Sequence, residues 1–217
     1  MALRAAALLL LLALQTSPAL AQADAPLTLI VTQGGKEIGR EDFTLIKGRG
    51  RGAAGTTLSA TASYPSATPT TRLTAVLERT AEFAIAKFQL DVQGPGGTTV
   101  ILAAGSGARL IVRTVATGSE SGRELPGGPD VLLLDEEVHS LYSAVADLAT
   151  PAGKRLTAIF PRTGKRASFT ARLESGQGET RRIVLTGDVA GTLLTDTEGR
   201  LQRLELPGQN KVVSRVE

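Results

Sequence analysis

The chain has 217 residues, no cysteine and no tryptophan, and its 24 Lys and Arg against 21 Asp and Glu give a formal net charge of +3. The lack of cysteine excludes disulfides and also the lipid-carrying cysteine of a bacterial lipoprotein. Basic residues are scattered singly or in pairs, and aromatic residues make up only 3% of the chain. Nucleic-acid binding requires a concentrated basic stripe with stacking aromatics, so the composition excludes that class of partner.

The first residues have the pattern of a signal peptide. Arg4 precedes the apolar stretch 5–14, and Ala21 and Ala23 each end a small-x-small cleavage motif. We therefore expect residues 1–21 to be a signal peptide, with cleavage after Ala21 or Ala23. The apolar stretch is too short to span a bilayer, so the protein is expected to be soluble and either periplasmic or secreted.

Residues 24–217 are expected to form a single, mainly antiparallel β domain. Apolar and polar residues alternate with period two along most of this range, and clusters rich in Gly, Pro and Ser interrupt the pattern at hairpin-like intervals. The clearest run is 166–173, where Ala167 and Phe169 share one face and Arg166 and Arg172 share the other. The pattern predicts a strongly curved antiparallel sheet, a half-barrel or open barrel, of about eleven to thirteen strands.

One segment breaks this period. At about 136–149 the apolar residues recur every three or four positions, Asp135 has the position of an N-cap, and Pro151-Ala-Gly153 closes the end. The spacing predicts one amphipathic helix of about three turns packed on the apolar face of the sheet.

Catalytic and metal-binding signatures are absent from the sequence. His139 is the only histidine, and without cysteine it has only carboxylates such as Asp135 and Glu136 as possible co-ligands or acid–base partners. Gly105-Ser-Gly107 does not match the nucleophile elbow of a serine hydrolase. A phosphate-binding loop requires glycines between a strand and a helix, whereas the glycines here lie in predicted hairpin turns. We expect no catalytic residue, no metal and no cofactor.

A curved sheet with a helix over its concave side makes an apolar groove, which is a typical site for lipid tails or similar ligands. The alternative is that the same apolar residues simply form the core. The candidate ligand-binding residues are Val138, Leu141, Tyr142 and Val145 from the helix, with Phe83, Phe88, Phe160 and Phe169 from strands.

The last 90 or so residues carry short motifs that resemble uncharacterised bacterial envelope families, mainly over 130–217. These motifs are Leu132-Leu-Leu-Asp135 followed by Ser140-Leu-Tyr142, and the hairpin Asp196-x-x-Gly199-Arg-Leu201 followed by Leu204-x-Leu206-Pro207. Those families resemble the lipoprotein carriers, in which an antiparallel sheet forms a half-barrel around a helix. The resemblance implies a periplasmic half-barrel that binds a hydrophobic or lipid-like molecule, and it implies no particular reaction.

The sequence leaves several functions open. The first is an exported, non-enzymatic protein that binds or carries a hydrophobic or lipid-like ligand. The second is a structural or assembly factor that contacts an envelope protein through exposed sheet edges. A hydrolase that uses Asp135, Glu136 and His139 is a third, less favoured reading. An outer-membrane barrel is also disfavoured, because five Phe and two Tyr are too few for its aromatic girdles.

Overall fold

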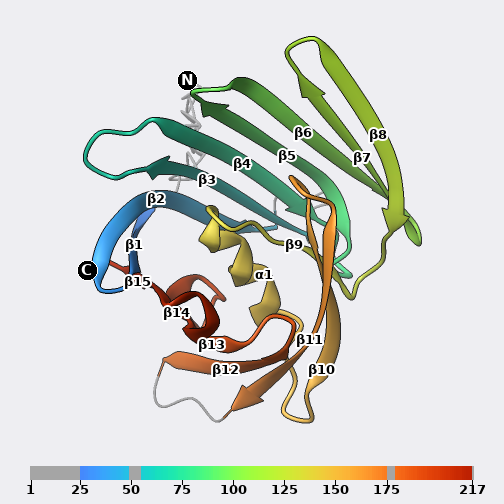
Figure 1. The fold of residues 1–217 in the computed structure, drawn as a ribbon. Coiled ribbons are helices and arrows are strands. Elements are labelled where there is room, and N and C mark those ends of the chain that lie inside the picture. Colours follow the sequence, from blue (N-terminus) through green and yellow to red (C-terminus); the bar gives the residue numbers. More distant parts are fainter. Residues whose placement is uncertain (1–24, 49–54, 175–178, 217) are drawn as a thin grey trace, which may run out of the picture.

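The computed structural model describes residues 25–48, 55–174 and 179–216, and the predicted signal peptide lies outside these described residues. The described strands form one sheet that curves into a nearly closed barrel around a short helical segment (Figure 1). The strands are β1 (Leu27–Gln33), β2 (Lys36–Lys47), β3 (Thr56–Tyr64), β4 (Thr71–Arg79), β5 (Ile85–Gly94), β6 (Gly97–Ser106), β7 (Arg109–Ala116), β8 (Ser119–Pro126), β9 (Val131–Leu133), β10 (Lys154–Phe160), β11 (Lys165–Glu174), β12 (Thr180–Gly187), β13 (Gly191–Asp196), β14 (Leu201–Leu206) and β15 (Lys211–Arg215).

The strand order explains why the sheet curves. Strands β1 to β8 form one meander, β10 to β15 form a second with β9 beside β10, and antiparallel pairing of β1 with β15 joins the two. The two edge strands of the sheet are therefore β8 and β9, and only residues 127–130 connect them. Such a link reaches at most about 18 Å, so the two edges of the sheet must come close together.

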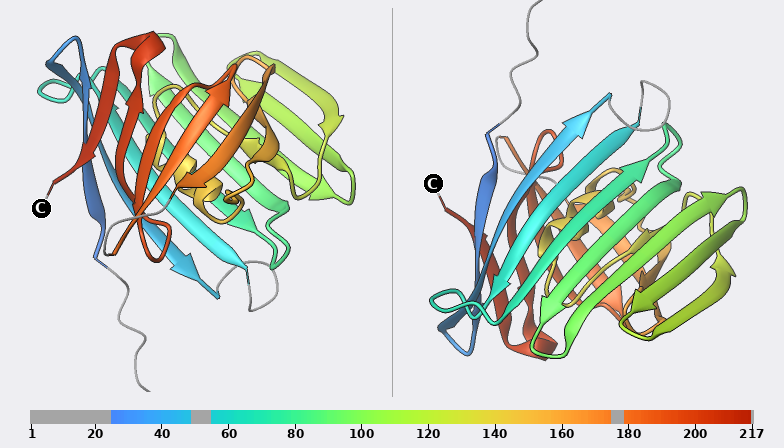
Figure 2. Two further views of the ribbon diagram at one scale, coloured as in Figure 1. Left: turned by 90° about the horizontal axis from the view of Figure 1, so that it is seen from below. Right: turned by 90° about the horizontal axis from the view of Figure 1, so that it is seen from above.

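One pair of strands departs from the antiparallel pattern. Strands β9 and β10 are parallel, with Ala158 opposite Leu132, and parallel neighbours require a long crossover connection. The crossover 134–153 contains the 3-10 helix η1 (His139–Tyr142) and the helix α1 (Ser143–Ala146). Figure 2 shows from two sides that the sheet wraps around this crossover.

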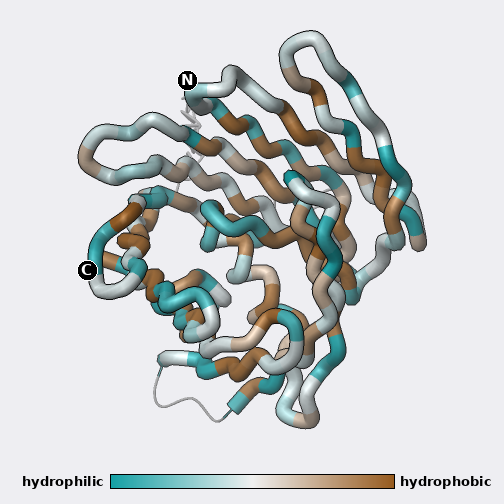
Figure 3. Tube along the Cα trace, in the orientation of Figure 1, coloured by the Kyte–Doolittle hydropathy of each residue, from teal (hydrophilic) through white to brown (hydrophobic). Residues whose placement is uncertain are grey.

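Alternation along the strands builds the core. Hydrophobic and hydrophilic residues alternate along most strands (Figure 3), as a sheet with one dry and one wet face requires. In β11 the predicted inward residues Ala167, Phe169 and Ala171 are buried, whereas Arg166 and Arg172 are exposed. The predicted mainly β, curved antiparallel sheet is thus confirmed.

The described residues contain fifteen strands, against the eleven to thirteen expected. Strand β8 is exposed or half-buried along its whole length and therefore shows no apolar alternation, and β9 consists of three consecutive buried residues. Neither strand produces a period-two pattern, so that pattern alone does not identify them.

The helical segment is shorter than predicted and lies inside the barrel. Regular helix covers 139–146 instead of 136–149, because Val138 has non-helical dihedral angles (φ −119°, ψ 88°). Asp135 is not the N-cap: its Oδ1 accepts a hydrogen bond from the N–H of Glu137 before the helix begins. Every residue of 138–146 is buried, so this segment is surrounded by the sheet rather than laid on one face of it.

Two buried charged side chains from the sheet hold the ends of this segment. At its start, Glu41 Oε2 accepts the N–H of His139 at 2.7 Å and Oε1 accepts the N–H of Ser140 at 3.0 Å. At its end, Arg79 Nη1 donates to the carbonyl of Ala144 at 3.2 Å and pairs with Asp147 Oδ2 at 3.1 Å. The carboxylate accepts N–H groups at the N-terminal end of the segment, and the guanidinium donates to a carbonyl at its C-terminal end. Both charges suit the peptide groups that have no partner within the helical segment.

Candidate functional site

Several turns of the two meanders meet at one end of the barrel, where the crossover enters the interior. In a meander every second turn lies at the same end, which brings together the β1–β2, β10–β11, β12–β13 and β14–β15 turns with the end of β3. Two adjoining hollows open there, and both are lined by Glu136 and Phe160. We call the pair of hollows the mouth cavity.

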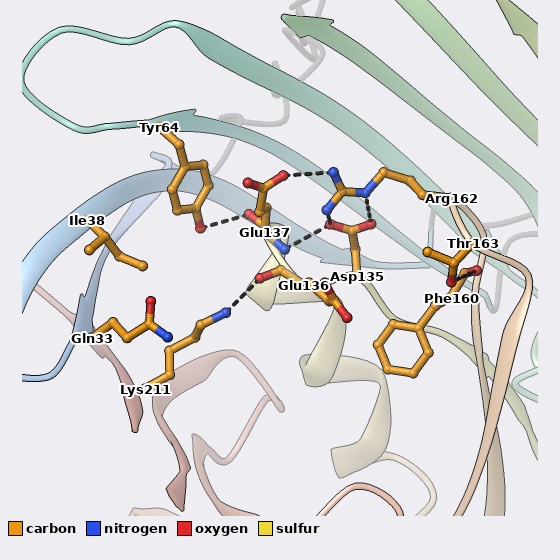
Figure 4. Close-up of a pocket in the computed structure, with 10 residues that line it drawn as sticks. All are labelled: Gln33, Ile38, Tyr64, Asp135, Glu136, Glu137, Phe160, Arg162, Thr163 and Lys211. Carbon is orange, nitrogen blue, oxygen red and sulfur yellow. Dashed lines mark hydrogen bonds and ion pairs between the residues drawn. The ribbon is translucent and has the colours of Figure 1, made fainter. Parts of the chain in front are cut away.

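The first part, the Arg162 hollow, has a volume of about 390 Å³. Figure 4 shows its lining side chains, with the crossover residues between Tyr64 and Arg162. The lining residues are Gln33, Ile38, Tyr64, Asp135, Glu136, Glu137, Phe160, Arg162, Thr163 and Lys211. Lys211 Nζ donates a hydrogen bond of 2.9 Å to the carbonyl oxygen of Glu136, so this lysine also fixes the backbone of the crossover.

Arg162 ties the crossover to the β10–β11 turn. Its Nε and Nη2 donate to Asp135 at 2.8 and 2.9 Å, and its Nη1 donates to Glu137 Oε2 at 2.8 Å. Burial raises the pKa of Asp135, and the charge of Arg162 opposes that rise. Burial also lowers the pKa of Lys211. The guanidinium of Arg162 is thus occupied by protein carboxylates, whereas the Lys211 ammonium keeps donors for a ligand.

The second part, the Tyr142 hollow, has a volume of about 240 Å³. Its lining residues are Glu136, Tyr142, Phe160, Lys165, Ala167, Asp188, Val189, Ala190, Leu206, Gly208 and Gln209. Tyr142 is 2% exposed, and its phenolic oxygen has no hydrogen-bond partner among the described residues. Burial raises the pKa of this phenol, which therefore stays protonated.

The other tyrosine, Tyr64, is engaged by the protein. Its hydroxyl lies 3.0 Å from the carbonyl oxygen of Glu137, to which it donates, and 3.3 Å from His139 Nδ1. Its ring lies over Gly39, where an added Cβ would be 2.0 Å from a ring carbon, so glycine is required beneath it. Tyr64 thus holds the crossover in place.

His139 does not pair with Asp135 or Glu136, as a hydrolase would require. It is 1% exposed, and its Nδ1 lies 3.3 Å from the Tyr64 hydroxyl and 3.8 Å from Glu41 Oε2. Burial lowers the pKa of His139 to about 3, so the ring is neutral. The described part of the chain contains no group of three or more His, Cys, Asp or Glu side chains arranged to hold a metal ion.

The eight candidate ligand-binding residues are divided between the core and surface hollows. Tyr142 and Phe160 line the mouth cavity. Phe88 is buried and also contributes to a hollow of about 490 Å³ on β4–β7. The others lie in the hydrophobic core or, for Phe83, are packed half-buried against it: Val138, Leu141, Val145, Phe83 and Phe169. Most of the eight residues therefore pack in the hydrophobic core.

Sequence reasoning missed the polar residues of the mouth cavity. Lys211, Lys165 and Asp188 lie in or beside turns and belong to no motif. The strand alternation predicted the faces of the sheet, but it gave no information about which turns meet at the same end. The meander order supplies that information, because alternate turns share an end.

Comparisons with known proteins support the fold. No family model matches the chain, and no curated protein matches it. A solved structure of a beta-barrel-like protein of domain of unknown function DUF1849 from Brucella abortus is similar, with a TM-score of 0.50 and 10% identity over 89% of this chain and 94% of that one. A DUF1089 family protein from Pseudomonas aeruginosa has a TM-score of 0.47 and 13% identity over 78% and 90% of the two chains.

These observations define a class of protein. The chain has a β-barrel-like fold of the kind found in uncharacterised families, with a single sheet wrapped around a buried crossover. Across residues 25–48, 55–174 and 179–216, no helix has the length and apolar character needed to cross a membrane.

Proposed function

We propose that the protein is an exported, non-catalytic binding protein of the cell envelope that takes a small amphipathic ligand at the mouth cavity. The observation that carries the proposal is Tyr142, a residue that is only 2% exposed, lines the hollow and has no hydrogen-bond partner for its hydroxyl among the described residues. Because the hydroxyl has no protein partner there, a ligand that enters the hollow can form a hydrogen bond with it without breaking one within the described residues. The signal-peptide pattern of the first residues supports export.

The surroundings of Tyr142 favour a ligand with both an apolar and a polar part. Phe160, Val189 and Leu206 supply apolar surface, while Lys165 and Asp188 lie at the exposed rim. Such a mixture of apolar walls and a few convergent polar groups is typical of small-molecule sites. The expected likeness to lipoprotein carriers belongs to this proposal, with the ligand placed at the mouth instead of along the inner helix face.

The experiment is native mass spectrometry with lipid extraction on protein purified without detergent from its own envelope fraction. We expect a discrete added mass on the wild type that organic solvent removes, and a reduced occupancy in Tyr142→Phe. Protein of bare sequence mass in the wild type would contradict the proposal. An added mass retained equally by Tyr142→Phe would place the ligand elsewhere.

A second candidate is an assembly factor that pairs with an envelope protein through edge strand β8. Strand β8 is hydrogen-bonded to β7 alone, and its residues are exposed or half-buried. Gly122, Pro126 and the charged residues of β8 weaken it as a template, since such residues protect free edges. A stoichiometric complex from the envelope fraction that is lost on Gly122→Pro would favour this function over the first.

A further inference from the structure

Four charged side chains surround the mouth cavity without pairing with each other. Glu136, Asp188 and Lys165 are exposed and Lys211 is half-buried, and none of the four forms an ion pair with another residue in the described ranges. Charges of both signs are therefore available to a ligand that enters the cavity.

The negative side chains gather around the Tyr142 hollow. Glu136 and Asp188 both line it, together with the ring of Phe160. Lys165 Nζ already lies 5.9 Å from the centroid of the Phe160 ring, which shows that this wall accommodates an ammonium ion. Asp188 Oδ2 accepts the N–H of Ser168, and its other oxygen is left for a ligand. A carboxylate, an aromatic face and a phenol together suit a primary ammonium.

Of the two unpaired lysines, Lys211 lies in the Arg162 hollow. Lys211 uses one donor on the Glu136 carbonyl and has two more. Glu136 lines both hollows, so the cation-binding and anion-binding parts are adjacent and separated by only one residue of the crossover. A ligand that meets both parts must carry its two charges on neighbouring groups.

We propose that the mouth cavity binds a zwitterionic head group, with its ammonium in the Tyr142 hollow and its anionic group at Lys211. This inference rests on the proposed ligand-binding function and names the chemistry of the ligand. Phosphoethanolamine has this chemistry, either free or as the head group of a phospholipid. Apolar Ile38 and Phe160 beside Lys211 offer contact for the chain of a lipid.

The test is isothermal titration calorimetry on the purified protein with four probes. The probes are phosphoethanolamine, dihexanoyl phosphatidylethanolamine below its micellar concentration, inorganic phosphate and ethanolamine. We expect the first two to bind at least about tenfold more tightly than phosphate or ethanolamine, because only they satisfy both charge sites. Tighter binding of the lipid than of free phosphoethanolamine identifies a lipid source, and equal binding identifies the free head group.

The variants assign each charge to its site. Tyr142→Phe, Asp188→Asn and Lys211→Met are each expected to weaken phosphoethanolamine binding by about tenfold, within the range of one charge-assisted hydrogen bond. Asn at position 188 still accepts the Ser168 N–H, so its effect is one of charge. Lys87→Met and Glu82→Gln change exposed charges that do not line the mouth cavity and serve as controls, with binding expected to be unchanged.

Lys165→Met distinguishes the orientation of the ligand. If the ammonium occupies the Phe160 wall, removing the Lys165 charge leaves the affinity equal or higher, whereas a loss of affinity would mean that Lys165 binds the anion and would overturn the proposed orientation. Phosphate binding as tightly as phosphoethanolamine would overturn the zwitterion inference. If native mass spectrometry finds a ligand but none of the four probes binds, this inference fails while the proposed function stands.

Discussion

The interior of the barrel and its mouth differ in the partners of their charged side chains. Inside, Glu41 accepts two backbone N–H groups and Arg79 pairs with Asp147, although Arg79 Nη2 and His139 Nε2 have no hydrogen-bond partner among the described residues. At the mouth, Tyr142 has no partner for its hydroxyl among the described residues, and Lys165 and Asp188 form no ion pair with them. The unpaired groups of the mouth face an open hollow, so a ligand that enters it meets them directly.

The two tyrosines of the chain differ in the same way, in whether the hydroxyl has a protein partner. Tyr64 contacts Glu137 and His139 and holds the crossover, whereas the Tyr142 hydroxyl has no hydrogen-bond partner among the described residues. Removing the Tyr64 hydroxyl should therefore lower the stability of the fold, and removing the Tyr142 hydroxyl should lower the affinity for a ligand.

Arg79→Met should have the largest effect on stability. It leaves Asp147, whose side chain is 11% exposed, without its partner, and it removes the donor to the Ala144 carbonyl. Breaking a buried pair from one side costs about 3–5 kcal/mol. Urea unfolding should show that loss, while Arg113→Met, at an exposed pair with Glu120, should change the stability far less, because solvent screens an exposed ion pair. Equal losses in the two variants would refute the role assigned to Arg79.

Glu41→Gln should change how stability depends on pH. Burial raises the pKa of Glu41 from 4.5 to about 7, so between these values the folded protein holds a proton that the unfolded chain releases. The stability that this proton contributes is complete below pH 4.5 and is lost as the pH rises to 7. The loss is about 3 kcal/mol, because each unit of pKa shift corresponds to about 1.4 kcal/mol.

The wild-type curve alone does not reveal this loss, because His139 acts in the opposite direction. Its pKa is lowered to about 3 by burial, so its contribution to stability is lost as the pH falls below its normal value of 6.5. The informative quantity is the stability of the wild type minus that of Glu41→Gln, measured by urea unfolding at several pH values. We expect this difference to fall by about 3 kcal/mol from pH 4.5 to 7, and a constant difference would mean that Glu41 has an ordinary pKa.

Tyr64→Phe should have a smaller effect. It removes the hydroxyl that donates to the Glu137 carbonyl and contacts His139, and a hydrogen bond of this kind contributes about 1 kcal/mol. The midpoint of urea unfolding should shift down accordingly. Ligand binding at the mouth should weaken only as far as the crossover moves. If the stability of Tyr64→Phe is unchanged, the hydroxyl does not hold the crossover.

Much of the fold follows from the sequence through local patterns. The alternation in β11 predicted its buried and exposed faces correctly, and Gly199 of the expected hairpin has a left-handed conformation with φ of 84°. The helix boundary at 139 was not predictable from local rules, because the group that accepts its first N–H groups is Glu41, 98 positions away from His139. Local capping rules pointed to Asp135, whose carboxylate is held by Arg162 instead.

The candidate site was less predictable. Tyr142 and Phe160 were expected to contact a ligand because they are apolar residues at suitable spacing, and they do line the mouth cavity. Lys165, Asp188 and Lys211 gave no signal, because isolated charges in turns are common on any surface. Their proximity arises from the strand order and the parallel β9–β10 crossover, which depend on the whole chain.

The most direct measurement of the central claim compares Tyr142→Phe with the wild type in two assays on the same preparations, urea unfolding and calorimetric titration with phosphoethanolamine. Because the hydroxyl has no described protein partner, we expect the ligand-free variant to be as stable as the wild type or slightly more stable. We expect its affinity to be about tenfold lower. A variant that loses stability but binds like the wild type would contradict the account, because the hydroxyl would then serve the fold and not the ligand.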